Sequence, residues 1–406
     1  MKTPYTRLLE WTRDNCLPLD RSLDALEAPL RALIGNARLV SIGEGLHGAR
    51  EPIEFRNALF AWLVERMGFC AIALESGLSA GLAIDAFVQG GTGELEDVVG
   101  SGITSGLHRY PQQAGLVRWM RAFNAERPSG GKPLSFYGID TSPLSGSPAA
   151  AIEMALAVLQ RVDAKGAAEL HQRLEPLRPC LGVERTSPEP RGYTTLDEAQ
   201  RDAVTAVVEG LANRIEPYAE DAARAVRQAE SYLRQFERGW CAAKGPSGAW
   251  PSIAISDRQK AENVEHLLRQ RLAASGRMLL FSHLGHASTL PVSIALGAET
   301  VALPEMMGSH LKRLCAEGEL LTIGHLIGDN QCQPEVGVAP ADSLEGRLAT
   351  LGHDALLLDL RRAPPEVLEE LHAEPHRLHG QLPVHQLSPG LGIDVIYFTR
   401  QATPAR

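Results

Sequence analysis

Ionisable residues follow four of the apolar runs that are typical of buried strands. Glu44 follows LVSIG, Glu75 follows AIAL, Asp140 follows FYGI and His283 follows LLFS. In an open parallel sheet the carboxyl ends of the strands line the ligand crevice, so we expect these side chains to meet in one pocket. The competing interpretation is that each strand simply ends in a polar residue at the rim of the core. Carboxylates gathered beside imidazoles favour a site that moves protons during bond cleavage.

Two short motifs place histidines at these strand ends. In SIGEGLHGARE, Glu44 lies between two glycines and His47 follows three residues later, so one turn can carry both side chains. In FSHLGHAS, His283 and His286 are three residues apart. A carboxylate that holds a histidine in one tautomer also raises its basicity, which suits the ring to take a proton from water. The second histidine pair can polarise a carbonyl or stabilise an oxyanion.

Other candidate residues have both a structural and a functional interpretation. Arg56, on the helix after the first motif, can pair with Glu75 as a structural bridge. It can also neutralise the carboxylates or hold a polar group of a substrate, and these roles are compatible. His108 and His310 are single histidines, which are usually solvated or structural. The same holds for His47 taken alone, and its neighbours are what favour a catalytic role.

Metal and covalent chemistry are less favoured by the motifs. Neither E-x-x-H in a glycine-flanked turn nor H-x-x-H is the helical H-E-x-x-H of zinc enzymes. ESGLSAG lacks the G-x-S-x-G framing of a nucleophilic serine, and Cys70 lies within an apolar strand. The residues that are nevertheless competent metal ligands are Glu44, His47, Glu75, His283 and His286.

A dinucleotide-binding site is the strongest alternative interpretation of the first motif. Gly43, Gly45 and Gly48 have G-x-G-x-x-G spacing between a strand and a helix. Against this interpretation, Glu44 lies inside the loop, and Glu51 and Glu54 lie in the first helical turn. Negative charge therefore occupies the place where a pyrophosphate would bind. No P-loop lysine follows the glycines, so we do not expect a nucleotide cofactor.

These motifs require an α/β fold to bring them together. Apolar runs typical of buried strands alternate with longer stretches of helical periodicity, which predicts a three-layer fold with a mostly parallel central sheet and helices on both faces. Residues 51–67 repeat apolar side chains at helical spacing, with Pro52 in the first turn. The predicted strands are residues 37–43, 69–74, 134–139, 278–282, 320–323, 355–360 and 394–398.

The middle of the chain has a different character. Between about residues 149 and 275 strand-like runs are scarce, and Ala, Glu, Arg and Leu dominate. We expect a helical insertion that forms a lid or side bundle, interrupted by a proline-rich loop. The expected organisation is one catalytic unit: residues 1–148 and 276–406 form the two parts of the α/β core, and residues 149–275 form the insertion.

Composition excludes several classes of protein. The 406 residues include 40 Lys plus Arg and 49 Asp plus Glu, a formal charge of −9, and 44% are hydrophobic. That content is typical of a globular chain, and the acidic surplus argues against a nucleic-acid partner. Six scattered cysteines without a C-x-x-C pair indicate reduced thiols. With no apparent signal peptide or apolar run long enough for a membrane span, we expect a cytoplasmic protein without a membrane partner.

Several of these segments match a known family. SIGEGLHGAREPIEFRNALFAWLVERMGFCAIALESG resembles the N-terminal segment of the erythromycin esterases. The resemblance continues through FYGIDTSP, SDRQKAENV, LLFSHLGHAS, EMMGSHLKRL and DVIYFTRQATPAR. GEGLH, ALESG and HLGH in this order are specific for the family and less specific for the substrate.

The resemblance implies an α/β core with a helical accessory region, and hydrolysis of a macrolide lactone without a covalent intermediate, a metal or a cofactor. His47 would then be the general base, with Glu44 and Glu75 orienting it or the water. Arg56, His283 and His286 would complete the polar pocket and stabilise the oxyanion. The candidate substrate-binding residues are His108, Tyr110, Asp257, Arg258 and His310.

Two positions depart from the family pattern. Leu284 stands where the esterases usually have asparagine in H-N-x-H. Ser256 precedes Asp257 where an arginine is usual, and Arg258 follows instead. Loss of a donor that grips the substrate or the oxyanion would lower the rate by about 10²-fold or more.

The leading hypothesis is therefore a metal-independent carboxylic ester hydrolase that opens a macrolide-type lactone, an activity of antibiotic resistance. The alternative is a biosynthetic enzyme that uses the same site for cyclisation, elimination or acyl transfer on a polyketide-like or other natural product. A third possibility is a non-catalytic protein that sequesters an apolar ligand. In each case the expected partner is a small molecule.

Overall fold

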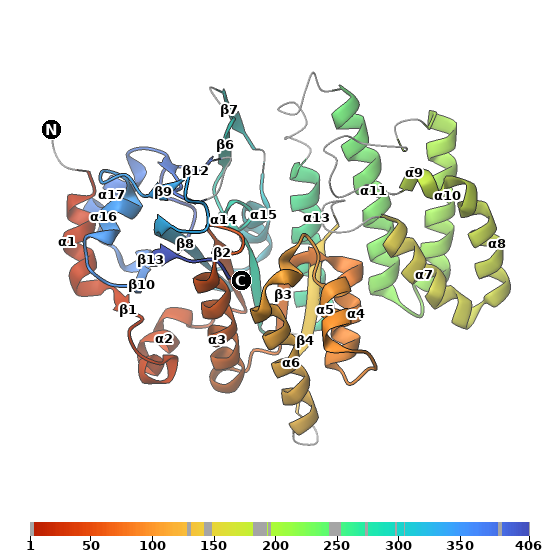
Figure 1. Cartoon of the computed structure of the whole chain (residues 1–406), viewed down its shortest axis with the longest axis horizontal. Helices are drawn as coiled ribbons and strands as arrows, with labels where there is room; N and C mark the ends of the chain where they lie inside the picture. The colour runs from red at the N-terminus through yellow and green to blue at the C-terminus, as the bar shows by residue number, and fades with distance from the viewer. Residues whose placement is uncertain are drawn as a thin grey trace. The chain divides into compact units, whose positions relative to one another are not determined.

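The computed structural model describes residues 4–127, 131–141, 148–181, 193, 196–242, 253–272, 275–296, 299–303, 305–380 and 384–405. The chain divides into two compact units (Figure 1). The first consists of Met1–Leu74, Arg109–Ser135 and Ala261–Arg406, and the second of Glu75–His108 and Phe136–Lys260. The domain boundaries expected from the sequence, after residues 148 and 275, stay a prediction.

A large, mostly parallel sheet forms the centre of the first unit, in the order β1-β10-β13-β8-β2-β5-β3. The neighbours from β13 to β3 are parallel, whereas β1, β10 and the short β9 pair antiparallel. This confirms the predicted α/β class. The strands are β1 (Leu17–Pro18), β2 (Leu39–Glu44), β3 (Ala71–Gly77), β5 (Met278–His283), β8 (Leu320–Asn330), β9 (Gly337–Val338), β10 (Ala355–Asp359) and β13 (Val395–Ala402).

The register of β2 and β5 brings two of the predicted residues together. These strands are buried along their whole length, as expected for apolar runs covered on both faces. They pair in parallel from Leu39 beside Met278 to Glu44 beside His283. The two side chains therefore leave adjacent strands at the same edge of the sheet.

A second, antiparallel sheet in the same unit has the order β11-β12-β6-β7. Its strands are β6 (Val292–Leu296), β7 (Glu299–Ala302), β11 (His376–Arg377) and β12 (Val384–Leu387). The sequence predicts none of them, because each has at most five residues and none is a long apolar run bounded by turns.

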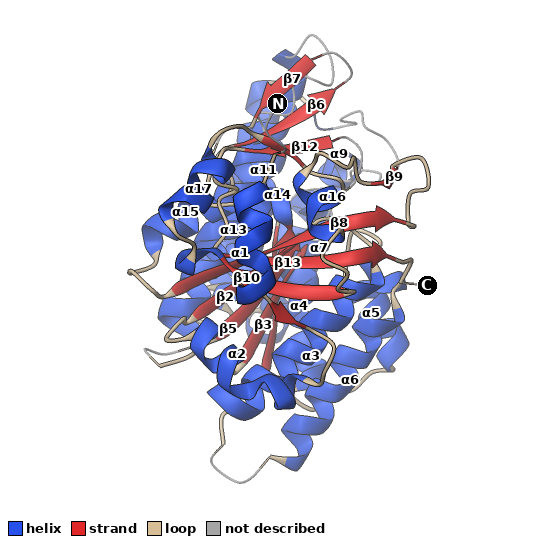
Figure 2. Ribbon diagram, turned by 90° about the vertical axis from the view of Figure 1, so that its left-hand side faces the viewer, coloured by secondary structure: helices blue, strands red, loops and turns tan. Residues whose placement is uncertain are grey.

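Helices cover the large sheet of the first unit. Helix α3 confirms the predicted helix, and Gly68 ends it in a left-handed conformation at φ 70°. Helices α1 and α16 pack against the sheet, α1 on β10 and α16 on β8 and β13 (Figure 2). The helices of this unit are α1 (Thr6–Asn15), α2 (Glu27–Ile34), α3 (Arg50–Met67), α6 (Pro111–Glu126), α14 (Leu284–Ala287), α15 (Met307–Leu314), α16 (Leu344–Ala349) and α17 (Pro365–His372).

The second unit is mostly helical. Helices α7, α8, α10 and α11 pack on one another around buried leucine, valine and alanine side chains. Strand β4 (Ser135–Asp140) lies against the end of β3, since a side chain on Gly138 would meet the backbone of Gly77. The helices are α4 (Leu78–Val88), α5 (Leu95–Gly102), α7 (Pro148–Val162), α8 (Ala164–Leu174), α9 (Arg178–Leu181), α10 (Glu198–Ile215), α11 (Glu220–Ala242) and the first half of α13 (Ile253–His266).

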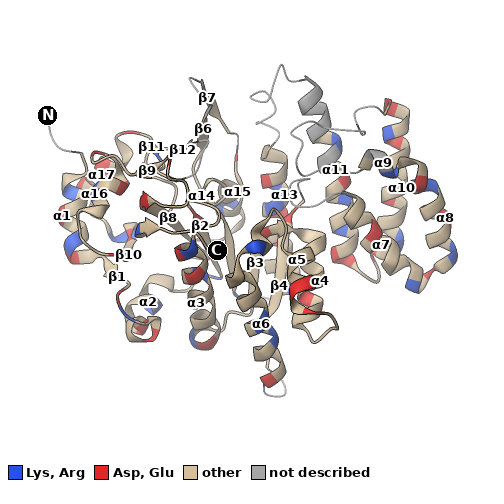
Figure 3. Ribbon diagram, viewed as in Figure 1, with Lys and Arg blue, Asp and Glu red and all other residues tan. Residues whose placement is uncertain are grey.

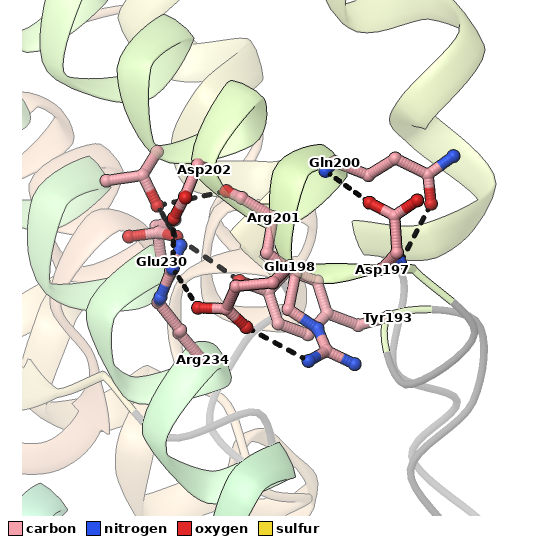
Figure 4. Close-up of polar contacts among 9 residues, drawn as sticks. Tyr193, Asp197, Glu198, Gln200, Arg201, Asp202, Glu230 and Arg234 are labelled. Carbon is pink, nitrogen blue, oxygen red and sulfur yellow. Dashed lines mark hydrogen bonds and ion pairs between the residues drawn. The ribbon is translucent and has the colours of Figure 1, made fainter.

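A polar cluster joins α10 to α11 (Figure 4). The carboxylate of Glu230 accepts hydrogen bonds from Thr205 Oγ1 at 2.7 Å and from the Tyr193 hydroxyl at 3.3 Å. Arg234 donates to Thr205 at 2.6 Å and pairs with Asp202 at 2.5 Å. Burial raises the pKa of Glu230. Each of these groups has a partner on the facing helix, which gives the cluster a structural role in the bundle.

The surface properties agree with the composition. Acidic and basic residues are mixed along the helices (Figure 3). None of the helices within the described ranges has the length and apolar composition of a membrane span. Cys16, Cys70, Cys315 and Cys332 are free thiols. The side chains of Cys180 and Cys241 lie outside the described residues.

Candidate active site

The end of β2 and the loop after it carry a carboxylate–imidazole pair. Nδ1 of His47 lies 2.7 Å from Oε1 of Glu44. The Glu44 side chain is 2% exposed, whereas that of His47 is 36% exposed. Because an ionised carboxylate can only accept a hydrogen bond, Nδ1 carries the proton and the lone pair of the neutral ring lies on Nε2. The Nε2 atom of His47 can therefore act as a base.

Contacts from distant parts of the chain hold this loop. Gly48 has φ 82°, and a side chain there would also collide with the Tyr110 hydroxyl. The backbone N–H of Ala405 donates to the Gly48 carbonyl at 3.0 Å. Thr403 donates its N–H and its hydroxyl to the Glu51 carboxylate at 2.8 and 2.5 Å. The C-terminal segment and the predicted residue Tyr110 thus help to set the position of His47.

His325, which the sequence analysis did not single out, supports the same loop from β8. Its Nδ1 accepts from the Gly45 N–H at 3.5 Å, and its Nε2 donates to Thr399 Oγ1 at 2.9 Å. Its ring stacks on Tyr397, with the centroids 4.9 Å apart. Burial lowers the pKa of His325 to about 3, so the ring stays neutral at physiological pH. We therefore assign His325 the role of holding the backbone at Gly45, and not that of a base.

His283 presents the opposite tautomer to that of His47. Its Nδ1 accepts a hydrogen bond from the Gly285 N–H at 3.1 Å. In the neutral ring the proton is therefore on Nε2, which makes that nitrogen a hydrogen-bond donor. The ring centroid of His283 lies 5.1 Å from that of His47, 6.4 Å from that of His286 and 4.6 Å from that of His385. The His283 ring therefore lies among three other imidazoles, one of which, that of His47, is paired with Glu44.

His385 belongs to this group, although sequence reasoning missed it. It lies on β12 in the second sheet, and its carbonyl accepts from the Leu378 N–H at 2.9 Å. The segment that carries it reaches the loop after β2, since a side chain on Gly380 would collide with the Gly45 carbonyl. Asn330 Nδ2 donates to the Gly380 carbonyl at 2.7 Å. No pattern around PVHQL marks this histidine, because a four-residue strand has too little periodicity to identify its buried face.

Glu345 anchors the same segment, and glutamine in its place should stabilise the protein at pH 8 but not at pH 5. Oε1 of Glu345 accepts from the His379 N–H at 2.9 Å. Burial raises the pKa of Glu345 from 4.5 to about 7. The stabilisation from its bound proton is present below the unfolded pKa and is lost as the pH rises through the folded pKa. Glutamine keeps the acceptor without the charge.

The measurement for Glu345→Gln is the thermal midpoint of both proteins at pH 5 and pH 8. We expect the variant to gain on the order of 1 to 3 kcal/mol at the higher pH only. An equal change at both pH values would contradict the assignment.

Arg56 of α3 is buried next to the Glu44–His47 pair. Its Nε and Nη2 donate to Asn57 Oδ1 at 3.0 and 2.6 Å, and Nη2 also donates to Gln113 Oε1 at 2.9 Å. Its guanidinium lies 4.7 Å from the centroid of the Phe281 ring. Burial lowers the pKa of Arg56 to about 10 and the charge of Glu44 opposes that shift, so the group is cationic at neutral pH. Among the described residues, Nη1 has no hydrogen-bond partner.

The predicted residues Glu75 and Asp257 lie in the second unit and share a lysine. Nζ of Lys260 is 3.5 Å from Glu75 Oε1, 3.7 Å from Asp140 Oδ2 and 4.0 Å from Asp257 Oδ2. Ser256 donates its hydroxyl to Asp140 Oδ1 at 2.9 Å. Sequence reasoning missed Lys260, although its i, i+3 spacing from Asp257 was a usable signal for one helix face.

Three further candidates were predicted from the sequence, namely His108, Arg258 and His310. Arg258 is exposed on α13, and His108 lies half-buried in a short 3₁₀ turn of the second unit. His310 on α15 contacts Arg313 at 3.0 Å and Glu305 at 3.9 Å. Their substrate-binding roles stay predictions. Within the residues that the structure describes, no group of three or more His, Cys, Asp or Glu side chains has the arrangement of a metal site.

Comparison with known sequences identifies relatives. A model of the erythromycin esterase family matches residues 64–401, a range that begins after His47 and includes Glu75 and His283. The erythromycin esterase type II of Escherichia coli is 30% identical over 148 residues. That match spans 35% of this chain and 33% of the relative, about a third of its length.

Solved structures with the same fold cover nearly the whole chain. A Bacillus cereus protein has a TM-score of 0.75 at 18% identity, covering 98% of each chain. A succinoglycan biosynthesis protein has a TM-score of 0.76 at 20% identity, covering 100% of this chain and 99% of the other. An erythromycin esterase mutant in its open conformation has a TM-score of 0.67 at 19% identity, covering 95% and 96%. At these identities the likeness shows the fold.

Proposed function

Because the chain belongs to the erythromycin esterase family, we propose that it opens the lactone ester of a macrolide with water as the nucleophile. The resemblance seen in the sequence motifs is confirmed by the family match. The observation that carries the mechanism is the 2.7 Å contact between Glu44 and His47. A buried carboxylate that holds a partly exposed imidazole through Nδ1 leaves Nε2 as the proton acceptor that water needs.

In the proposed first step, His47 Nε2 takes a proton from water while the water oxygen attacks the lactone carbonyl. The carbonyl π electrons move to oxygen, and the resulting oxyanion needs hydrogen-bond donors. His283 supplies an Nε2–H, because its Nδ1 is occupied by the Gly285 N–H. The guanidinium of Arg56 adds positive charge close to Glu44. Together with His283 and Arg56, His286 would complete the polar side of the pocket.

In the second step, the tetrahedral intermediate collapses and the ring C–O bond breaks. The leaving alkoxide takes the proton from the His47 imidazolium, which returns the base to its starting state. The products are a carboxylic acid and an alcohol in one opened chain. Glu75 would orient the water or the base, as the family resemblance implies. We propose that this chemistry proceeds without a metal or a cofactor, because the Glu44–His47 pair itself provides the base.

The position of Leu284 bears on the substrate. Leu284 is fully buried, and a side chain on Gly43 would lie 2.8 Å from its Cα, so it packs against β2. An asparagine at this place would offer a hydrogen-bonding group that leucine lacks. We therefore expect the macrolide to be held mainly by other donors.

Purified protein is incubated with erythromycin, and the product is analysed by mass spectrometry. We expect a product heavier than erythromycin by one water. We expect the same rate with and without EDTA. No mass gain even at high enzyme concentration would contradict macrolide hydrolysis, and a rate abolished by EDTA would contradict the metal-free mechanism. A product of unchanged mass, or lighter by one water, would instead indicate cyclisation or elimination.

A further inference from the structure

Lys260 lies at the centre of a buried acidic cluster in the second unit. Its side chain is 3% exposed, and those of Asp140 and Asp257 are 4% and 0% exposed. Glu75 is the most accessible member, with 14% of its side chain exposed. The three N–O distances lie between 3.5 and 4.0 Å. These distances are longer than direct hydrogen bonds, so the ammonium acts on the three carboxylates mainly through its charge.

One face of α13 builds this cluster. Ser256 and Lys260 are one helical turn apart, and both reach Asp140 at the end of β4. Gln259, on the same side, accepts from the Thr141 hydroxyl at 2.5 Å. The polar face of the helix is therefore aligned on the carboxyl ends of β3 and β4.

We propose that Lys260 is a positioning residue of the hydrolysis, which keeps the Glu75 carboxylate ionised and in place at the end of β3. This inference rests on the proposed function, since Glu75 owes its role to that proposal. Buried carboxylates this close to one another repel and take up protons unless a cation is near. The ammonium of Lys260 lies 3.5 Å from Glu75 and opposes that uptake there.

The departure at Ser256 fits this role. In the family pattern that the sequence resembles, an arginine is usual at this position; here Ser256 donates its hydroxyl to Asp140, and the positive charge lies one turn later, at Lys260. Positions 256 and 260 lie one turn apart on the same helix face, and both of their side chains lie near Asp140. The two positions should therefore be exchangeable as sources of the cation.

The first experiment exchanges them. We expect Lys260→Met to lower kcat for erythromycin hydrolysis by about 10²-fold with KM changed less than about 3-fold. Lys260→Arg should retain most of the activity. The double variant Ser256→Arg with Lys260→Ala keeps the charge and nearly the same side-chain volume, and it should recover at least about 10-fold over Lys260→Met. Lys165→Met, at an exposed residue of α8 in the same unit, is the matched control.

A second measurement needs no substrate and separates this inference from the proposed function. Without the ammonium, the buried carboxylates bind protons more tightly in the folded state than in the unfolded chain. The stability from those protons is lost as the pH rises. The thermal midpoint of Lys260→Met should therefore fall further below that of the wild type at pH 8 than at pH 5, and the double variant should not show this widening.

The outcomes are distinct. If the wild type does not hydrolyse erythromycin, the proposed function fails, while the pH dependence still tests the electrostatic role of Lys260. If folded Lys260→Met keeps its kcat within about 3-fold of an active wild type, the positioning role is overturned. If the double variant regains stability but no activity, Lys260 supports the fold alone, and the positioning role is again overturned.

Discussion

Replacing His47 with glutamine is expected to lower kcat by about 10³-fold while the protein stays folded. Glutamine is polar and similar in size, but it has no nitrogen that takes a proton at neutral pH. The side chain is 36% exposed, so its loss leaves no cavity in the core. The reaction that remains would rely on the oxyanion donors and on binding. The measurement is the steady-state rate of macrolide opening, with folding checked by circular dichroism.

The pH profile provides the second half of this test. A protonated imidazole cannot accept a proton from water, so kcat/KM of the wild type should fall as the pH is lowered. His47→Gln should lose that acidic limb together with its activity. Glu44→Gln should also lower kcat, because an amide stabilises the imidazolium less and its NH₂ can hold the ring in the other tautomer. His171→Gln, an exposed site on α8, is the control. Unchanged kcat in folded His47→Gln would remove this residue from the mechanism.

Replacing Arg56 with methionine is expected to lower kcat by about 10²- to 10³-fold. Arg56 is fully buried, and its Nε and Nη2 donate to Asn57 and Gln113, whereas its buried Nη1 has no partner among the described residues. We expect this donor and the charge to act on the reacting groups. Its pKa of about 10 means that this charge persists across the whole neutral range. Methionine fills a similar apolar volume and keeps the contact with Phe281 possible, so the loss reports on the guanidinium.

Lysine at position 56 should recover only part of the lost rate. Its ammonium is a point charge that cannot reproduce the planar fork that serves Asn57 and Gln113 together. Arg66→Met, near the end of the same helix and paired with Asp24 at the surface, is the matched control. The two Arg56 variants and this control are compared by kcat, KM and thermal midpoint. A folded Arg56→Met enzyme within about 3-fold of the wild-type kcat would show that the buried charge serves only the fold.

Seven strands were predictable because burial and periodicity are local properties, whereas the two-residue strands β1 and β9 were not predicted. All seven apolar runs form strands, although β8 extends to Asn330, well beyond the predicted residue 323. The same reasoning located Glu44 and His283, because parallel neighbours deliver the residues at their carboxyl ends to one edge. The turn GEGLH placed His47 near Glu44 for an equally local reason, a spacing of three residues.

His385, His325 and Lys260 were not predictable in the same way. His385 and His325 lie on strands whose partners are remote in sequence, so their neighbours follow from pairing and not from local pattern. Lysine side chains are usually exposed to solvent, and only the tertiary structure buries Lys260 beside Glu75.

The sequence by itself determined the α/β class, the family and the Glu44–His47 pair, because short-range spacing and alternating apolar runs specify strands, helices and turns. Only the tertiary structure decided which nitrogen of each histidine carries the proton. The Nδ1 atoms of His47 and His283 meet a carboxylate in one case and a backbone N–H in the other. It also decided that three imidazoles gather around that of His283 and that Lys260 lies beside Glu75. Such groupings depend on contacts between residues far apart in the chain, which no local pattern encodes.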